Sequence, residues 1–353
     1  MANQYTSYYL YQKYEKRGDQ DWLPCYPNIF SVDGEGTMPL VIKTENDPEC
    51  GYTPPTEPIY RWYNIPISQD YICDVCPVYK LVATYGVGNT HEIVCDDNTT
   101  LSRSDVRSGD YSYSAMTSAA IGNCITSIGD AAFGSCISLE SINIPTSVTT
   151  IGQYTFTNCY SLTSISIPYS VTSIGEGVFS NCSGLTSCTI GSSVTTISTY
   201  AFNRCRSLTS INIPNSVTSI GIRAFRECTS LTSVTMGNNV TTIGDDAFSG
   251  CTSLTSIDMP DSVETIGASV FSDCTNLTSC TIGSGITHID SWTFENCTGL
   301  TSVTVKATTP PHIGIYVFNN TNDCPIYVPS ASVDTYKAAN RWSDYASRIQ
   351  AIP

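Results

Sequence analysis

Apolar residues recur with a 23-residue period from about residue 116, and eight periods follow each other without an insertion. One period, from Cys251 to Asp273, reads C-T-S-L-T-S-I-D-M-P-D-S-V-E-T-I-G-A-S-V-F-S-D. Leu254, Ile257 and Met259 predict one short strand that faces a core. Pro260 ends this strand because proline has no N–H to give to a ladder. Internal repeats of this length are typical of solenoids.

The second half of the period predicts another short apolar pair and a turn. Val263 and Ile266 form the pair, and Gly267 permits a bend that a Cβ would hinder. A short helical or tight-turn segment then carries Val270 and Phe271 inward. One rung cannot bury these groups alone, so we expect rungs to stack about 4.8 Å apart, into a rod on the order of 45 Å long.

The invariant columns predict the core. Phe, Leu, Ile and Cys each recur every 23 residues, and a ninth, degenerate rung follows at Ile313, Phe318 and Cys324. The members of the Phe column are Phe133, Phe156, Phe179, Phe202, Phe225, Phe248, Phe271 and Phe294. The members of the Cys column are Cys136, Cys159, Cys182, Cys205, Cys228, Cys251, Cys274 and Cys297. A free thiol behaves as a small apolar group, so we expect a buried, reduced thiol column rather than a disulfide scaffold.

The consensus S-L-T-S-I-x-I-P-x-S-V-T-S-I-G-x-x-A-F-x-x-C, over residues 116–325, resembles the BspA-like (Treponema pallidum-type) leucine-rich repeat. The predicted fold class is therefore an α/β solenoid, a leucine-rich-repeat array of 23-residue rungs with a parallel β ladder. Residues 326–353 resemble the terminal cap of such proteins from gut Bacteroidota and their phages. The side chains that could cover the open apolar end are Tyr336, Trp342, Tyr345 and Ile349.

The amino-terminal third differs in kind and is rich in tyrosine. The run from Pro54 to Pro58 indicates a linker or extended turn. Alternation in Tyr79–Tyr85 and Glu92–Cys95 predicts small antiparallel elements, and Tyr111–Ile128 predicts an entry cap. We expect a small β-rich amino-terminal part in two sections. These are an anchoring domain at residues 1–78 and a β-rich connector or entry cap at residues 79–115.

Two stretches of this third, Tyr8–Gly34 and Asp70–Gly86, resemble segments of structural proteins of crAss-like and related gut bacteriophages. The resemblance implies a module that anchors a display domain to a virion. The first residues lack the continuous apolar segment of a secretory signal, which fits a protein made in a cytoplasm and released by lysis.

The charge pattern argues against two classes of partner. The net charge is −15, and no basic stripe could release counterions from a nucleic acid. An anionic membrane surface is disfavoured for the same reason, and no apolar run is long enough to span a bilayer. We therefore expect neither nucleic-acid binding nor membrane insertion.

Candidate chemistry is sparse. His91, His288 and His312 are scattered, no catalytic or phosphate-binding motif is present, and we expect neither an enzyme nor a cofactor. Carboxylates on consecutive rungs, without the order of a calcium loop, indicate solvated surface: Asp245, Asp246, Asp258 and Asp261. Cys73 and Cys76 have the spacing of a metal knuckle, and Cys50 and Cys95 could complete a zinc site. Zinc, a disulfide and free thiols stay open there, and Cys25 and Cys124 are unassigned.

The rungs differ most two residues before the Phe column. That position holds Ala131, Tyr154, Gly177, Tyr200, Arg223, Asp246, Ser269 and Trp292. In a solenoid, varying columns face solvent, so Tyr154, Tyr200 and Trp292 are candidate contact residues for a sugar face or a protein. Ordinary surface variation is the alternative.

Four arginines on two consecutive rungs form a second candidate. Arg204, Arg206, Arg223 and Arg226 could hold a carboxylate or sulfate, whereas Glu227 beside them suggests local charge balance. A third face is a flat polar ladder at the middle of S-I-x-I, which could dock a glycan or a neighbouring subunit or simply suit an exposed sheet. Its members are Asn143, Ser166, Thr189, Asn212, Thr235, Asp258, Thr281 and Thr304.

Together these features lead to a functional hypothesis. We expect a non-enzymatic phage virion appendage, fibre-like or decorating, in which the amino-terminal region contacts other virion proteins. The solenoid would contact host surface glycan or protein, and we expect a homo-oligomer or part of a larger assembly. The alternatives are a bacterial cell-surface adhesin and a purely structural virion component without receptor binding.

Overall fold

The computed structural model describes residues 7–10, 28–31, 79–85, 89–94, 99–107 and 112–353. The chain divides into two compact units, Met1–Pro77 and Val78–Pro353. In the first unit, β1 (Ser7–Leu10) pairs antiparallel with β2 (Asn28–Ser31). The expected linker at Pro54–Pro58 lies outside the described residues.

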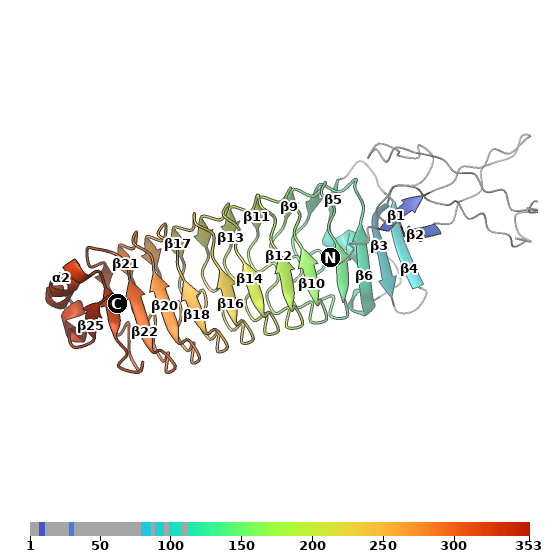
Figure 1. The fold of residues 1–353 in the computed structure, drawn as a ribbon. Helices are drawn as coiled ribbons and strands as arrows, with labels where there is room; N and C mark the ends of the chain where they lie inside the picture. Colours follow the sequence, from blue (N-terminus) through green and yellow to red (C-terminus); the bar gives the residue numbers. More distant parts are fainter. Residues whose placement is uncertain (1–6, 11–27, 32–78, 86–88, 95–98, 108–111) are drawn as a thin grey trace, which may run out of the picture. The chain divides into compact units, whose positions relative to one another are not determined.

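The second unit begins with antiparallel strands that lead into a parallel ladder (Figure 1). β3 (Tyr79–Tyr85) pairs antiparallel with β4 (Asn89–Val94) and with β6 (Met116–Ile121). β6 then pairs in parallel with β8, the first strand of the repeat. The expected antiparallel elements are confirmed. Between them lie two short helices, α1 (Arg103–Val106) and η1 (Tyr113–Ala115).

One side of the solenoid is a continuous parallel sheet of ten two-residue strands. Each strand pairs in register with the equivalent residues of the next rung, as at Ile197 and Ile220. The ladder starts at Thr100, ahead of the first full repeat. Its strands are β5 (Thr100–Leu101), β7 (Ser127–Ile128), β9 (Thr150–Ile151), β11 (Ser173–Ile174), β13 (Thr196–Ile197), β15 (Ser219–Ile220), β17 (Thr242–Ile243), β19 (Thr265–Ile266), β21 (His288–Ile289) and β23 (His312–Ile313).

A second side carries the strands predicted from L-x-x-I-x-I. They are β8 (Ser141–Asn143), β10 (Ser164–Ser166), β12 (Ser187–Thr189), β14 (Ser210–Asn212), β16 (Ser233–Thr235), β18 (Ser256–Asp258), β20 (Ser279–Ile282), β22 (Ser302–Val305) and β24 (Ile326–Val328). This ladder is interrupted, and β10–β12 and β14–β16 form separate sheets of two strands each.

From β10 to β20, proline and glycine alternate after these strands, and the alternation matches the pairing. β14 is followed one residue later by Pro214, and its partner β16 is followed in the same way by Gly237. A Cβ on Gly237 would lie 2.5 Å from the Pro214 carbonyl oxygen, so only glycine permits this approach. The close contact repeats where Gly191 meets Pro168 and where Gly283 meets Pro260.

The core is a set of stacked columns, as predicted. From Phe133 to Phe318 the rings of neighbouring rungs lie 5.1–5.6 Å apart between centroids. The Leu and Cys columns are buried with them. The described cysteines of the column are free thiols, which confirms the expected reduced column.

The column thiols from Cys159 onward also have a hydrogen-bonding role. The Sγ–H of Cys182 donates to the carbonyl of Phe156 on the preceding rung at 3.0 Å, and the same bond recurs from Cys159 to Cys297. Burial raises the pKa of Cys182 and of Cys228 to about 12. The column therefore stays protonated and serves structure rather than thiolate chemistry.

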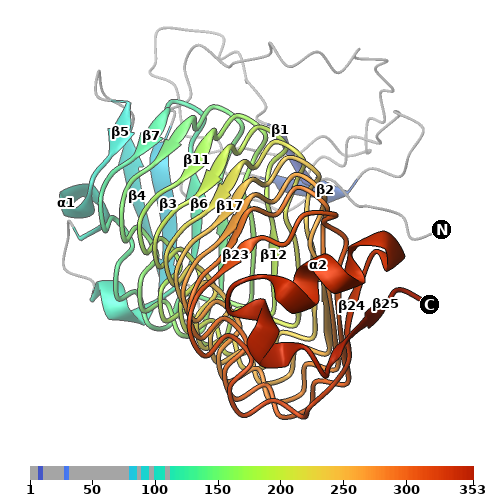
Figure 2. The same cartoon turned by 90° about the vertical axis from the view of Figure 1, so that its left-hand side faces the viewer.

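The carboxyl-terminal segment covers the last rung, as expected (Figure 2). Its elements are β24, η2 (Ser330–Ser332), α2 (Val333–Ala338), η3 (Trp342–Tyr345) and β25 (Ile349–Ala351). Trp342 and Tyr336 are buried and donate to the carbonyls of Pro311 and Ala307 at 2.8 and 2.9 Å. The indole N–H of Trp342 and the hydroxyl of Tyr336 thus both have hydrogen-bond acceptors on the last rung. None of the short helices among the described residues has the length and apolar character that crossing a bilayer requires.

Candidate binding face

The third side of each rung consists of turns, not helices, and we call this side the turn face. Two positions per rung have left-handed backbone. One is the variable column two residues before Phe, with φ between 49° and 58°; the other lies two residues after Phe. In both columns the backbone N–H donates to the next rung, as from Tyr154 to the carbonyl of Glu176 and from Asn158 to that of Ser180. The left-handed turn therefore joins rungs and fixes where these side chains leave the backbone.

The two columns differ in composition. Left-handed backbone suits Gly, Asn and Asp, and the column after Phe holds mainly these types together with Ser135, Arg204 and Glu227. The variable column instead holds four bulky aromatic residues at this conformation. They are Tyr154, Tyr200, Trp292 and Tyr316.

Tyr154 lies along the column over the next rung. Its hydroxyl donates to Glu176, and this hydrogen bond raises the pKa of Tyr154. A Cβ on Gly177 would lie 2.4 Å from Cε1 of the ring, so glycine makes the space that the ring occupies. Tyr154 keeps 38% of its surface exposed.

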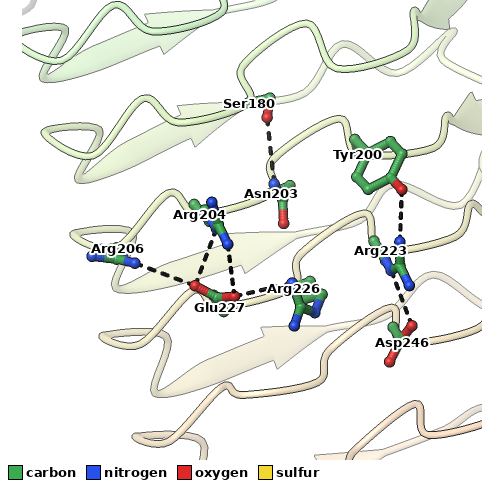
Figure 3. A network of polar contacts seen from close by, with 9 residues as sticks. All are labelled: Ser180, Tyr200, Asn203, Arg204, Arg206, Arg223, Arg226, Glu227 and Asp246. Carbon is green, nitrogen blue, oxygen red and sulfur yellow. Dashed lines mark hydrogen bonds and ion pairs between the residues drawn. The ribbon is translucent and has the colours of Figure 1, made fainter.

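Tyr200 is held in a polar contact (Figure 3). Unlike Tyr154, it is half-buried. Arg223 donates to the Tyr200 hydroxyl at 2.8 Å and to the Asp246 carboxylate at 3.0 Å. These two hydrogen bonds, that of Tyr200 first, raise the pKa of Arg223. Three members of the variable column on consecutive rungs thus form one contact chain.

The carboxyl-terminal end of the turn face carries an exposed apolar cluster. Trp292, Ile315 and Tyr316 lie on adjacent rungs and are 37%, 41% and 59% exposed. The backbone N–H of Trp292 donates to the carbonyl of Ile315 at 3.1 Å. The 23-residue period does not lead to Tyr316, because the ninth rung has one extra residue. Counting back two positions from Phe318 would have found it.

The arginine patch is one cluster around a carboxylate plus one separate pair. Arg204, Arg206 and Arg226 all lie within 3.3 Å of the Glu227 carboxylate (Figure 3). Burial raises the pKa of Glu227, but the hydrogen bonds of Arg204 and Arg206 and the nearby charges outweigh it, so the net pKa is lowered. Three cations around one anion leave a local excess of positive charge on the exposed guanidinium edges. Arg223 belongs to the Tyr200 contact instead.

The other candidates have structural contacts. The carboxylates of Asp245 and Asp261 accept from the backbone N–H of Ala268 and Ser284 on the next rung. Within the described residues, no three His, Cys, Asp or Glu side chains gather as a metal ion would require. Cys124, unassigned from sequence, is disulfide-bonded. Five cysteines lie outside the described residues, so their state stays a prediction: Cys25, Cys50, Cys73, Cys76 and Cys95.

Two of the three scattered histidines are brought together. His288 and His312 pair in register on β21 and β23, and their rings lie 5.6 Å apart between centroids. The extra residue of the ninth rung changes their separation in sequence to 24, which hid the column. The polar ladder on the strand face is exposed from Asn143 to Asp258 and half-buried at Thr281 and Thr304.

A family model for the BspA type leucine-rich repeat region matches residues 104–232 and 195–325. The chain belongs to this family. A solved leucine-rich-repeat protein from Bacteroides ovatus is 25% identical, with a TM-score of 0.51, and the match covers 73% of this chain and 71% of that one. No curated protein matches the sequence.

Two further solved structures are similar in fold. A leucine-rich cell surface protein from Faecalibacterium prausnitzii is 24% identical, with a TM-score of 0.34, and the match covers 76% of this chain and 90% of that one. The leucine-rich-repeat protein of T. pallidum is 25% identical, with a TM-score of 0.36, and the match covers 58% of this chain and 81% of that one.

Proposed function

We propose that this chain is a non-enzymatic recognition protein whose turn face contacts a glycan or a protein on a cell surface. The observation that carries the proposal is the variable column. A left-handed conformation costs a bulky residue roughly 1–2 kcal/mol, and a strained backbone position is a reason to look for function. Tyr154, Tyr200, Trp292 and Tyr316 keep large rings there, three of them exposed.

The arginine cluster supports the same face. Arg204 and Arg206 are exposed on the turn face and are the outer members of the Glu227 cluster. A carboxylate or sulfate of a partner could replace part of the Glu227 contact without adding a buried charge. Aromatic rings and guanidinium groups are the side chains most enriched in interface hot spots.

We further propose a virion as the setting, with residues 1–78 as the anchor that contacts other virion proteins. The support is the resemblance of Tyr8–Gly34 and Asp70–Gly86 to phage structural proteins. The bacterial cell-surface adhesin is the second candidate, and the similarity to a leucine-rich-repeat protein of the bacterium Bacteroides ovatus supports a bacterial source. A structural component that only packs against neighbours or copies of itself is supported by the flat polar strand face.

Binding of the purified full chain to intact gut Bacteroidota cells and to glycan arrays tests the recognition function. We expect saturable binding to at least one cell type or glycan. Absence of binding to both would contradict it. A particle reconstruction that finds this chain on a virion would support the phage setting, and its absence from purified particles would contradict that setting.

A further inference from the structure

A pocket of about 490 Å³ lies where the last rung meets the carboxyl-terminal cap. Tyr316, Asn319 and Asn320 of the last turn line one wall. Asp344 and Arg348 of the cap line the other. Tyr316 therefore belongs both to this pocket and to the exposed cluster with Trp292 and Ile315.

Arg348 is a buried cation in the lining of this pocket. Its side chain is 9% exposed, and its Nε–H donates to the carbonyl of Cys324 at 2.9 Å. Nη2 donates to Thr321 Oγ1 at 3.3 Å and to Cys324 Sγ at 3.4 Å, and the guanidinium lies over the Phe318 and Tyr345 rings. Nη1 faces Asp323 at 3.9 Å, beyond hydrogen-bond distance, and the Asp323 side chain is 96% exposed. Hydrogen bonds thus hold Nε and Nη2, and Nη1, which makes this long ion pair, is the nitrogen best placed to donate to a ligand.

The rest of the lining mixes donors and acceptors. The amide nitrogens of Asn319 and Asn320 donate to Glu295 and Asn296 on the preceding rung, at 3.0 and 2.9 Å. Their orientation leaves the side-chain oxygens of both residues as acceptors. Asp344 adds a carboxylate at the exposed side of the pocket.

The charge balance selects the ligand class. Arg348 contributes one positive charge to the pocket, and Asp323 and Asp344 contribute two negative charges. The two carboxylates would repel an anionic ligand, and the guanidinium would repel a cationic one. A polyol satisfies carboxylate acceptors and amide and guanidinium groups at the same time, because each hydroxyl both donates and accepts. An exposed ring beside such groups suits the apolar face of a sugar.

We propose that this pocket binds one neutral sugar residue of a surface glycan, with Tyr316 as the stacking platform and Arg348 and Asp344 as the hydroxyl-binding groups. The inference rests on the proposed function, since it names the ligand class and the place on the turn face. The glycan chain would continue from the pocket over Trp292.

The proposal is tested by titrating the full chain with neutral methyl glycosides of glucose, galactose, mannose and N-acetylglucosamine. Saturation-transfer NMR and calorimetry measure the binding. Asp344→Asn and Tyr316→Asn are the test variants, and asparagine suits the left-handed backbone at 316. Asp334→Asn and Tyr169→Asn are matched controls, because Asp334 and Tyr169 are also exposed and lie outside the pocket lining. Sialic acid and lysine methyl ester serve as anionic and cationic probes.

We expect at least one neutral glycoside to bind, each test variant to weaken it by about ten-fold or more, and the controls to leave it unchanged. No glycoside binding, equal affinity in the test variants, or preference for either charged probe would overturn the pocket proposal. If cells bind the chain but pocket variants change nothing, only the pocket proposal fails. If the glycoside binds as expected but no cell or array does, only the proposed function fails.

Discussion

At the scale of single residues, Tyr154 and Gly177 illustrate how the turn face is built. Gly177 has a φ of 57° and stands where the Tyr154 ring lies. The glycine answers two needs, a left-handed backbone and the absence of a Cβ. In the sequence Gly177 looks like ordinary surface variation, but in the structure it makes the space in which the Tyr154 ring packs.

Gly177→Ala tests this pair. We expect a loss of roughly 1–2 kcal/mol in unfolding free energy from the backbone alone, and more because the ring must move. Adding Tyr154→Asn to this variant should restore the share of the unfolding free energy that was lost because the ring had to move. The effects of the two substitutions on the unfolding free energy will therefore not be additive. Urea unfolding of the four proteins measures this, and additive effects would contradict the contact.

At the scale of the rung, the sequence predicted the L-x-x-I-x-I strand, the columns and the free thiols, because a strict 23-residue period reports them directly. It predicted only an apolar pair and a turn where the structure has the continuous ten-stranded sheet, because a strand of two residues is too short to show alternation. It could not predict that the variable column is left-handed, since Tyr and Trp are unusual there. It also could not show that Arg223 covers Tyr200, because side-chain packing between rungs depends on rotamers. The extra residue of the ninth rung hid both Tyr316 and the pairing of His288 with His312.

The thiol column predicts a pH dependence. The unfolded thiols lose protons from about pH 9, while burial keeps Cys182 and Cys228 protonated until about 12. The unfolded state is thus favoured as pH rises above 9, by about 1.4 kcal/mol per unit for each thiol. Replacing both residues by alanine should flatten the fall in unfolding free energy between pH 9 and about 10.5. Equal slopes in the variant and the unchanged protein would contradict the assigned protonation.

At the scale of the whole molecule, each rung of the repeat contacts only its neighbours in the array. The stability of a rung therefore depends on the interfaces that it makes with the rungs on either side. The carboxyl-terminal end depends on Trp342 and Tyr336, which are buried against the last rung. The antiparallel strands β3, β4 and β6 start the second unit at its other end. A long face of regular rungs is thereby kept folded while its outer residues stay free to vary.

Trp342→Ala should expose this dependence. Losing a buried tryptophan costs about 3–5 kcal/mol, and the loss should act first on the rungs beside the cap. In this variant, the rate of amide hydrogen exchange should increase in β22 and β23, whereas the amides of β13 and β15 should stay protected. Trp292→Ala, which removes an exposed ring, is the control. Uniform loss of protection along the solenoid would contradict the nearest-neighbour account.

The central claim is that the aromatic members of the variable column make the contact. The most direct test is a triple variant of the full chain that combines Tyr154→Asn, Tyr200→Asn and Trp292→Asn. Its affinity is measured for the cell or glycan that the unchanged protein binds. A matched control replaces Ile137, Tyr160 and Tyr169, which are exposed but lie outside the column. The account predicts a large loss of affinity without a lower melting temperature, because asparagine suits the left-handed backbone at these positions, and unchanged binding in the control. Equal affinity of the column variant and the unchanged protein would contradict it.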